Sequence, residues 1–323
     1  MKKVLIRLPN WLGDTVMSLP LIQGLTENKD LLIGLSGPEE CLEILRNEKR
    51  IDIFIPLIPH RSFWKQTLWR DEVLGWKADS IIILPTSLSS ALLSWWAKIP
   101  ERIGYASEGR GYLLTSSLPY DEKSYRRLHL TRSYKELGKL MLYKHIDFPE
   151  NPVFSESSPA NFNKDSPILI FPGATYGSAK RWDITNYVEI TKLIRQVSNR
   201  KILILGKDNE VVIENFEWAS GTFLMLGKTT IRQLIDYIKE SFLVIGSDSG
   251  PVHLSAAYLK NTVALFGSSS TAWTAPLGSR VRIVKSDVHC SPCFKPACHK
   301  RVCWESLTIS RVWEKVKEII EDS

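Results

Sequence analysis

The sequence predicts an α/β protein made of two Rossmann-like halves, and three observations support that fold class. Short apolar runs alternate with segments whose apolar residues recur at helical spacing, which is typical of βαβ units around a mostly parallel sheet. The alternation breaks in the Pro- and Ser-rich stretch 149–167 and then starts again. The length of 323 residues suffices for two ordinary cores. We therefore expect two domains joined by a linker.

Both halves contain the expected elements in alternating order. In the first half, apolar runs of strand length stand at 4–8, 31–35, 51–55 and 80–84, and helical periodicity at 15–25, 39–47 and 128–143. In the second half, strands are expected at 168–171, 201–205, 242–245 and 263–266, and helices at 185–197, 231–239, 252–259 and 308–321. The resulting bounds are 1–150 for the first domain, 151–167 for the linker, 168–305 for the second domain and 306–323 for a closing helix.

Composition and charge narrow the classes of partner. The net charge is +7 with cations spread along the chain, which indicates an acidic partner: nucleic acid, an anionic membrane surface, or a phosphorylated or carboxylated substrate. No nucleic-acid-binding signature accompanies the charge, and no Gly-x-Gly-x-x-Gly motif of a dehydrogenase follows either first strand. The start of the chain lacks the pattern of a signal peptide and no stretch reads as a membrane span, which predicts a cytoplasmic protein.

The segment RLPNWLGDTVMSLPLI, residues 7–22, places Asp14 between an expected strand and the helix that follows it. Open α/β sheets bind ligands at the carboxyl ends of their strands, and a helix amino terminus favours an ionised carboxylate. Asp14 is therefore a candidate proton acceptor. The alternative is a helix cap, a position where Asp is common, and the two roles do not exclude each other.

Two loops of the second half have the composition of an anion site. In PGATYGSAKRWD, residues 172–183, Gly173 lets backbone N–H groups approach a phosphate, Thr175 adds a hydroxyl and Lys180 a cation. This loop lacks P-loop spacing, and an ordinary strand–helix turn with surface cations is the alternative.

The second loop is GSDSGPVH, residues 246–253. Ser249 and Gly250 offer a hydroxyl and backbone donors at a helix start. Asp248 is a candidate for binding sugar hydroxyls, and His253 is a candidate for contacting the same ligand. The alternatives are a turn residue at Asp248 and a packed helix residue at His253.

A cluster of cysteines stands near the end of the chain. Cys290, Cys293, Cys298 and Cys303 lie within fourteen residues, with two histidines beside them. This density suggests a zinc or iron–sulfur site, although the spacing fits no zinc pattern cleanly. Free structural thiols or redox-labile pairs are the alternative.

Together, these motifs resemble glycosyltransferase family 9, the ADP-heptose–lipopolysaccharide heptosyltransferases, with the closer match to the heptosyltransferase II branch. The likeness is carried by RLPNWLGDTVMSLPLI, PGATYGSAKRW, IGSDSGPVHLSAA, ALFGSSSTAWTAPLG and HCSPCFKPACHKRVC, which follow the family order over nearly the whole chain. The resemblance implies a GT-B fold, in which two Rossmann-like domains face each other across a cleft and a C-terminal helix crosses back to the first.

The resemblance also implies an activity. It is the inverting, metal-independent transfer of L-glycero-D-manno-heptose from ADP-heptose to the Kdo-heptose inner core of lipopolysaccharide, with no cofactor required. A peripheral contact with the inner face of the cytoplasmic membrane stays open, because the acceptor is a membrane lipid. The true donor sugar, the core position and the oligomeric state stay open as well. So do two alternatives: another family 9 transferase, or a non-catalytic nucleotide- or anion-binding protein on the same fold.

The resemblance also implies functional roles for the residues of this sequence that match the family's motifs. Asp14 matches the family's general base, Lys180 its phosphate-binding Lys and Thr175 a phosphate-contacting hydroxyl. The donor-sugar and pyrophosphate loop is matched by Asp248, Ser249, Gly250 and His253, and either Asp208 or Glu210 is expected at the adenosine. A basic set is expected to meet the acceptor's carboxylates, namely Arg61, Lys65, Arg70, Arg102, Arg126, Arg127 and Arg132, with Arg102 and His129 matching family positions loosely.

Overall fold

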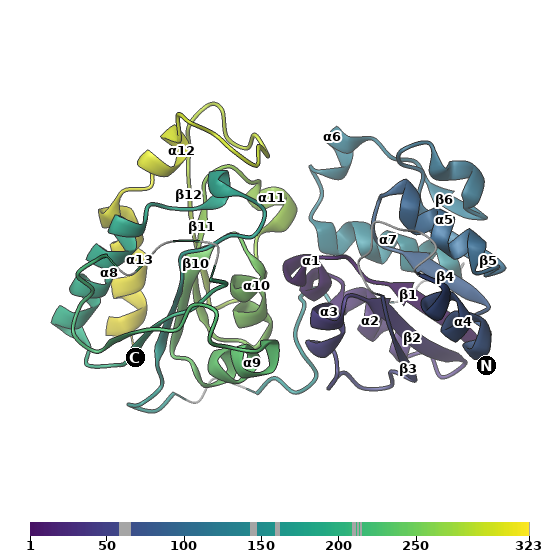
Figure 1. Ribbon diagram of the computed structural model, residues 1–323, viewed down its shortest axis with the longest axis horizontal. Coiled ribbons are helices and arrows are strands. Elements are labelled where there is room, and N and C mark those ends of the chain that lie inside the picture. The colour runs from purple at the N-terminus through teal and green to yellow at the C-terminus, as the bar shows by residue number, and fades with distance from the viewer. Residues whose placement is uncertain are drawn as a thin grey trace. The chain divides into compact units, whose positions relative to one another are not determined.

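The computed structural model describes residues 1–57, 66–142, 147–158, 162–208, 211, 213 and 215–322. The chain divides into two compact units, Met1–Glu156 and Ser157–Ser323, which we call unit 1 and unit 2. Each unit contains one six-stranded sheet in which all paired strands are parallel (Figure 1). Within the described residues, no helix is long and apolar enough to cross a membrane.

Unit 1 has the strand order β3-β2-β1-β4-β5-β6. Its strands are β1 (Lys2–Arg7), β2 (Leu31–Gly37), β3 (Ile53–Pro56), β4 (Ser80–Ile83), β5 (Glu101–Tyr105) and β6 (Ser116–Leu118). Its helices are α1 (Leu12–Met17), α2 (Leu19–Thr26), α3 (Glu39–Glu43), α4 (Thr67–Trp76), α5 (Leu88–Trp96), the 3-10 turn η2 (Arg110–Leu113), α6 (Glu122–Tyr125) and α7 (Leu130–Leu142). Apolar residues of α4 and α5 pack with Leu5, Ile81 and Ile83 in one core cluster, while α7 contacts α2 as well as β4 and β5.

Unit 2 has the strand order β12-β11-β10-β7-β8-β9. Its strands are β7 (Ile168–Phe171), β8 (Ile202–Ile204), β9 (Thr222–Leu224), β10 (Leu243–Ser247), β11 (Asn261–Phe266) and β12 (Val281–Lys285). Its helices are the 3-10 turn η3 (Ser178–Lys180), α8 (Ile184–Val197), α9 (Ile231–Glu240), α10 (Gly250–Ala257), α11 (Thr271–Thr274), α12 (Val302–Glu305) and α13 (Ile309–Glu321).

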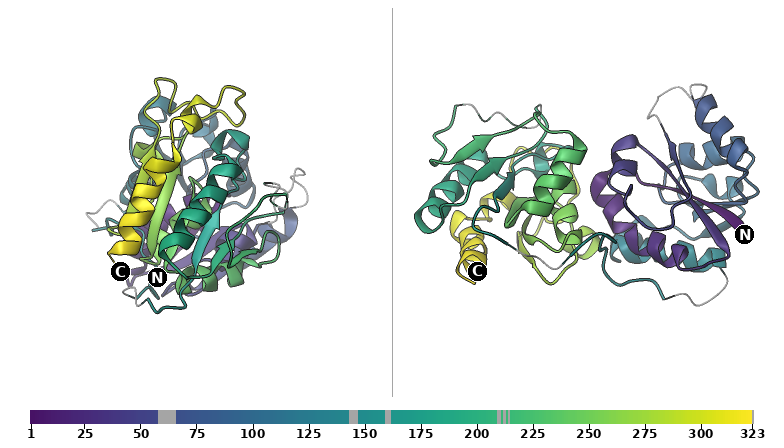
Figure 2. Two further views of the ribbon diagram at one scale, coloured as in Figure 1. Left: turned by 90° about the vertical axis from the view of Figure 1, so that its left-hand side faces the viewer. Right: turned by 90° about the horizontal axis from the view of Figure 1, so that it is seen from below.

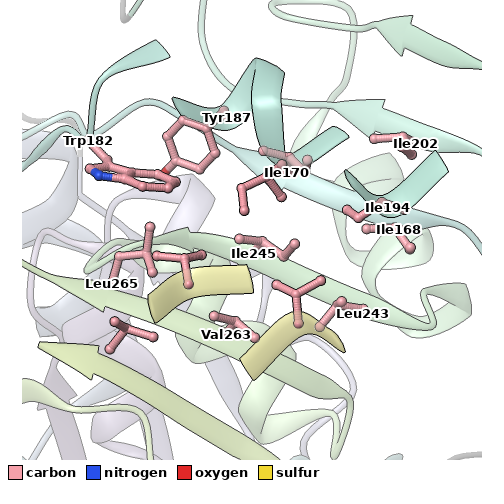
Figure 3. Packing of buried hydrophobic residues seen from close by; sticks show 14 of the residues in the cluster. Ile168, Ile170, Trp182, Tyr187, Ile194, Ile202, Leu243, Ile245, Val263 and Leu265 are labelled. Carbon is pink, nitrogen blue, oxygen red and sulfur yellow. The ribbon is translucent and has the colours of Figure 1, made fainter. Parts of the chain in front are cut away.

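The core of unit 2 follows from the pleat of its strands. Alternate residues of a strand point to the same face, so Ile168 and Ile170 of β7 and Ile245 of β10 enter one cluster together with α8 (Figure 3). The apolar face of α13 completes this cluster, and α13 lies beside α8 (Figure 2). The resemblance implies a closing helix that crosses back to the first half. The apolar face of α13 is buried on unit 2, where Val312 and Val316 pack into the core cluster.

Several elements differ from the expected ones for local reasons. The helix expected at 15–25 is two helices, because Ser18 turns its hydroxyl onto Thr15 O and α2 begins anew with Pro20 in its first turn. The short edge strands β6 and β9 were not expected. Neither β6 nor β9 has a fully buried residue, so their sequences do not need the apolar run that predicts a buried strand.

The order of the strands sets the place of the loops. It reverses between β1 and β4 in unit 1 and between β7 and β10 in unit 2. At such a switch point the connections leave toward opposite faces, and a crevice opens at the carboxyl ends of the two strands. Asp14 follows β1, the Lys180 turn follows β7, and Asp248 follows β10 directly. All three motifs therefore stand at switch-point edges.

Candidate active site

Unit 2 joins its two predicted loops through one buried carboxylate. Lys180 Nζ lies 2.7 Å from Asp248 Oδ2, and His253 Nε2 lies 3.5 Å from Asp248 Oδ1. The hydroxyl of Thr274 lies 3.5 Å from the same Oδ2 atom. The side chain of Asp248 is only 5% exposed, so these groups surround the carboxylate in place of water. The structure thus brings Lys180 together with Asp248 and His253 of the other loop, which lies about seventy residues further along the chain.

The electrostatics of Asp248 favour its ionised form. Burial alone would raise its pKa, because a carboxylate loses hydration in the interior. The ammonium of Lys180 and the hydrogen bond from His253 outweigh burial and hold the pKa of Asp248 well below its usual range. The ion pair is therefore present at neutral pH. Lys180 is 19% exposed, and its ammonium lies 5.2 Å from the centre of the Tyr176 ring.

The amino terminus of α10 offers backbone donors beside this pair. Ser249 is the N-cap residue, but its hydroxyl donates to Ser247 O and makes no capping bond. No side-chain cap therefore takes up the leading N–H groups of this helix, whose first turn begins with Gly250 and Pro251. Such a terminus suits an anion. In the other loop Gly173 is buried and Thr175 is exposed.

Asp14 lies in unit 1, in the first turn of α1. The helix begins at Leu12 with Trp11 as its N-cap, so Asp14 is inside the turn and not at the cap position. Its negative charge reaches Tyr125 and Tyr134: burial raises the pKa of both phenols well above their usual value, and Asp14 raises it further. Neutral phenol rings thus stand near this carboxylate.

The expected acceptor residues are not all brought to Asp14. Arg126 pairs with Glu122 at 2.6 Å and stands with His129 on the segment between α6 and α7. Arg102 is the second residue of β5, level with Ile81, and therefore lies toward the amino end of the strands, away from the edge that carries Asp14. Its guanidinium donates to the carbonyls of residues 99, 100 and 113. Arg61 and Lys65 lie outside the described residues, as does Glu210 of the adenosine expectation.

The cysteine cluster is a set of free thiols. Cys290 is exposed, Cys293 and Cys298 are partly buried, and Cys303 is buried. Burial raises the pKa of Cys303, and the other three thiols raise it further. The described residues contain no group of three or more His, Cys, Asp or Glu side chains placed to hold a metal ion.

Two residues of the site were missed by the sequence reasoning. Tyr176 places its ring beside Lys180, and Thr274 approaches Asp248 from α11. Thr274 stands inside the motif ALFGSSSTAWTAPLG, which supports the family resemblance although the sequence alone assigns no function to its residues. A hydroxyl and an aromatic ring have many uses in a fold, so neither could be assigned before the loops were seen together.

Comparison with known proteins points to one family. The model of glycosyltransferase family 9 (heptosyltransferase) matches residues 68–303. Lipooligosaccharide heptosyltransferase 2 of Campylobacter jejuni is 28% identical over 338 residues, which cover 99% of each chain. The protein of the same name from Haemophilus influenzae is 30% identical over 306 residues, covering 87% of this chain and 88% of its own. A solved structure of ADP-heptose LPS heptosyltransferase II from E. coli has a TM-score of 0.79 at 23% identity and covers 100% of this chain and 99% of that one. This likeness confirms the predicted α/β, GT-B-like fold class.

Proposed function

The chain belongs to glycosyltransferase family 9 and is a glycosyltransferase, and from this premise we propose that it transfers a heptose from ADP-heptose to the inner core of lipopolysaccharide. The names of its relatives support the sugar and the acceptor, and that of the E. coli structure supports the donor. The single observation that carries the proposal is the Lys180–Asp248–His253 cluster at the switch point of unit 2.

In this proposal unit 2 holds the donor. The ammonium of Lys180, the hydroxyl of Thr175 and the leading N–H groups of α10 bind the diphosphate, which leaves with growing negative charge in the transition state. Gly173 lets the backbone approach it closely. Ser249 and Gly250 start the helix that faces it, Asp248 and His253 serve the sugar end, and either Asp208 or Glu210 contacts the adenosine. Lys180 and the helix terminus carry the phosphate charge, so the proposed step needs no cofactor.

Unit 1 supplies the base. Asp14 takes the proton of the acceptor hydroxyl while that oxygen attacks the anomeric carbon in line with the departing diphosphate. A single displacement of this kind inverts the anomeric configuration. Arg61, Arg126 and His129 are proposed to meet the carboxylates of the acceptor, and Arg102 would act there only through the backbone that it holds. Because the acceptor is a membrane lipid, the protein would work at the inner face of the cytoplasmic membrane.

Product analysis tests the proposal. The protein is mixed with ADP-heptose and defined inner-core acceptors of increasing length, and the products are identified by mass and by the anomeric signals in NMR. We expect ADP and one heptosylated acceptor of inverted configuration. Transfer to a different core position would instead make the chain another transferase of the family. No transfer from ADP-heptose to any of the acceptors would refute the proposed substrates.

A further inference from the structure

The segment 290–304, which we call the cysteine segment, packs directly on the turn that carries Lys180. It first attaches to the end of β11: Ser291 Oγ donates to Gly267 O at 2.5 Å, and the N–H groups of Cys293 and Phe294 both donate to Ser268 O at 3.0 Å. The segment is thereby anchored to the carboxyl end of β11 before it reaches the turn.

Hydrogen bonds to two backbone carbonyls of the cysteine segment then join it to the turn. Ala179 N donates to Pro296 O at 3.1 Å, and Tyr176 OH donates to Phe294 O at 3.2 Å. Gly177 has a φ of 153°, and a Cβ at this position would lie 2.2 Å from Pro296 O. Only glycine allows both this backbone conformation and this close approach. The turn is therefore shaped against the cysteine segment.

The peptide plane before Lys180 is held at both of its polar atoms. The carbonyl of Ala179 accepts hydrogen bonds from Trp304 Nε1 at 2.6 Å and from Ser268 Oγ at 2.9 Å. The N–H of Lys180 donates to Gly177 O at 3.1 Å. Trp304 is 4% exposed and fits only because residue 267 has no side chain, since a Cβ there would lie 2.3 Å from its ring. The indole and the hydroxyl thus fix the direction in which the Lys180 side chain leaves the backbone.

We propose that the cysteine segment positions the ammonium of Lys180 for the donor diphosphate, with Trp304 and Ser268 as positioning residues. The inference rests on the proposed role of Lys180 in holding the diphosphate. It gives the segment a task that depends on its backbone and on Trp304, and it requires no metal at its thiols. A rotated peptide plane would move the ammonium off the phosphate while leaving the adenosine contacts in place.

Calorimetric binding of ADP and of adenosine to the full chain tests this inference. Trp304→Phe keeps an aromatic ring in the core and removes the N–H donor. We expect roughly a five- to tenfold weaker affinity for ADP, the effect of one lost hydrogen bond, and unchanged affinity for adenosine. The matched control is Trp69→Phe in unit 1, since Trp69 is 3% exposed and donates its indole N–H to Ser36 Oγ at 2.7 Å. This control should bind ADP as the wild type does.

The double variant Trp304→Phe/Lys180→Ala completes the test. If Trp304 acts through Lys180, Trp304→Phe has no further effect on ADP affinity once Lys180 is gone. An equal loss in both backgrounds, or an equal loss for adenosine, would overturn the inference. Unchanged ADP affinity in Lys180→Ala alone would instead refute the proposed role of Lys180, and the inference with it. Should Trp304→Phe fold poorly, Ser268→Ala removes the other donor to the same carbonyl and is measured in the same cycle.

Discussion

Replacement of Asp248 by Asn breaks the buried ion pair of unit 2 while keeping the size of the side chain. Removing one partner of a buried pair costs about 3–5 kcal/mol, because the other charge stays buried without compensation. Lys180 is 19% exposed and can recover part of its hydration. The amide oxygen of Asn can also keep a neutral hydrogen bond to the ammonium, worth about 1 kcal/mol. We therefore expect Asp248→Asn to lower the free energy of unfolding by about 2–3 kcal/mol.

Urea unfolding at neutral pH measures this loss. The matched control is Asp287→Asn, the same substitution at a pair with Arg311 that spans 3.2 Å but whose Asp287 side chain is 65% exposed. An exposed pair contributes only about 0–1 kcal/mol, so the control should unfold close to the wild type. The contrast between the two variants isolates the effect of burial from the effect of the substitution.

Acid reveals the sign of the Asp248 contribution. Its pKa is lowered in the folded state, so the stabilisation is present above the unfolded pKa of about 3.9 and is lost as pH falls toward the folded value. The stability difference between wild type and Asp248→Asn should therefore shrink as pH falls below about 4. A loss under about 0.5 kcal/mol at pH 7, or one that persists undiminished in acid, would refute the buried ionised carboxylate.

Three further substitutions test the site and the turn. Asp14→Ala removes the proposed base and should lower kcat by roughly 10²–10⁴-fold while ADP affinity, measured by calorimetry, stays unchanged; a wild-type rate would contradict the assignment. Lys180→Ala should weaken ADP binding by at least about tenfold, since a charge-assisted contact is worth about 1.5–3 kcal/mol, and an unaltered Kd would remove Lys180 from the donor site. Gly177→Ala should lower stability in thermal unfolding by about 1–3 kcal/mol because its Cβ meets Pro296 O, whereas Gly75→Ala, where a Cβ meets nothing within 4 Å, should not.

The central strands of both sheets were predictable because burial on both faces leaves a continuous apolar run. Leu243 through Ile245 of β10 show this pattern, and the expected strand there is confirmed. The edge strand β6 was not predictable. Its residues, Ser116–Leu118, are held by backbone pairing with β5 and carry no apolar signal of their own. Pairing partners of this kind are set by the fold as a whole and not by the local sequence.

For the site, the sequence indicated which loops matter but not how they meet. Gly-rich composition and helix-start chemistry singled out Lys180 and Asp248 separately. The contact between them depends on β7 and β10 being neighbours in the sheet, although about seventy residues of chain separate the two loops. The support given by Trp304 was still less visible, because an indole N–H that meets a backbone carbonyl leaves no mark in composition or spacing.

The ion pair between Lys180 and Asp248 influences how strongly the removal of Lys180 should weaken binding of the donor. In the proposed site the ammonium stands on a carboxylate that is already present before any ligand binds, so its rotamer and much of its desolvation are settled in advance. The same carboxylate would repel a diphosphate if the ammonium did not shield it. Lys180→Ala therefore removes an attraction and exposes a repulsion at once. The loss of ADP affinity should exceed that of Lys180→Ala/Asp248→Asn, in which the repulsion is absent. Equal affinities of the two variants would show that the carboxylate of Asp248 does not repel the diphosphate.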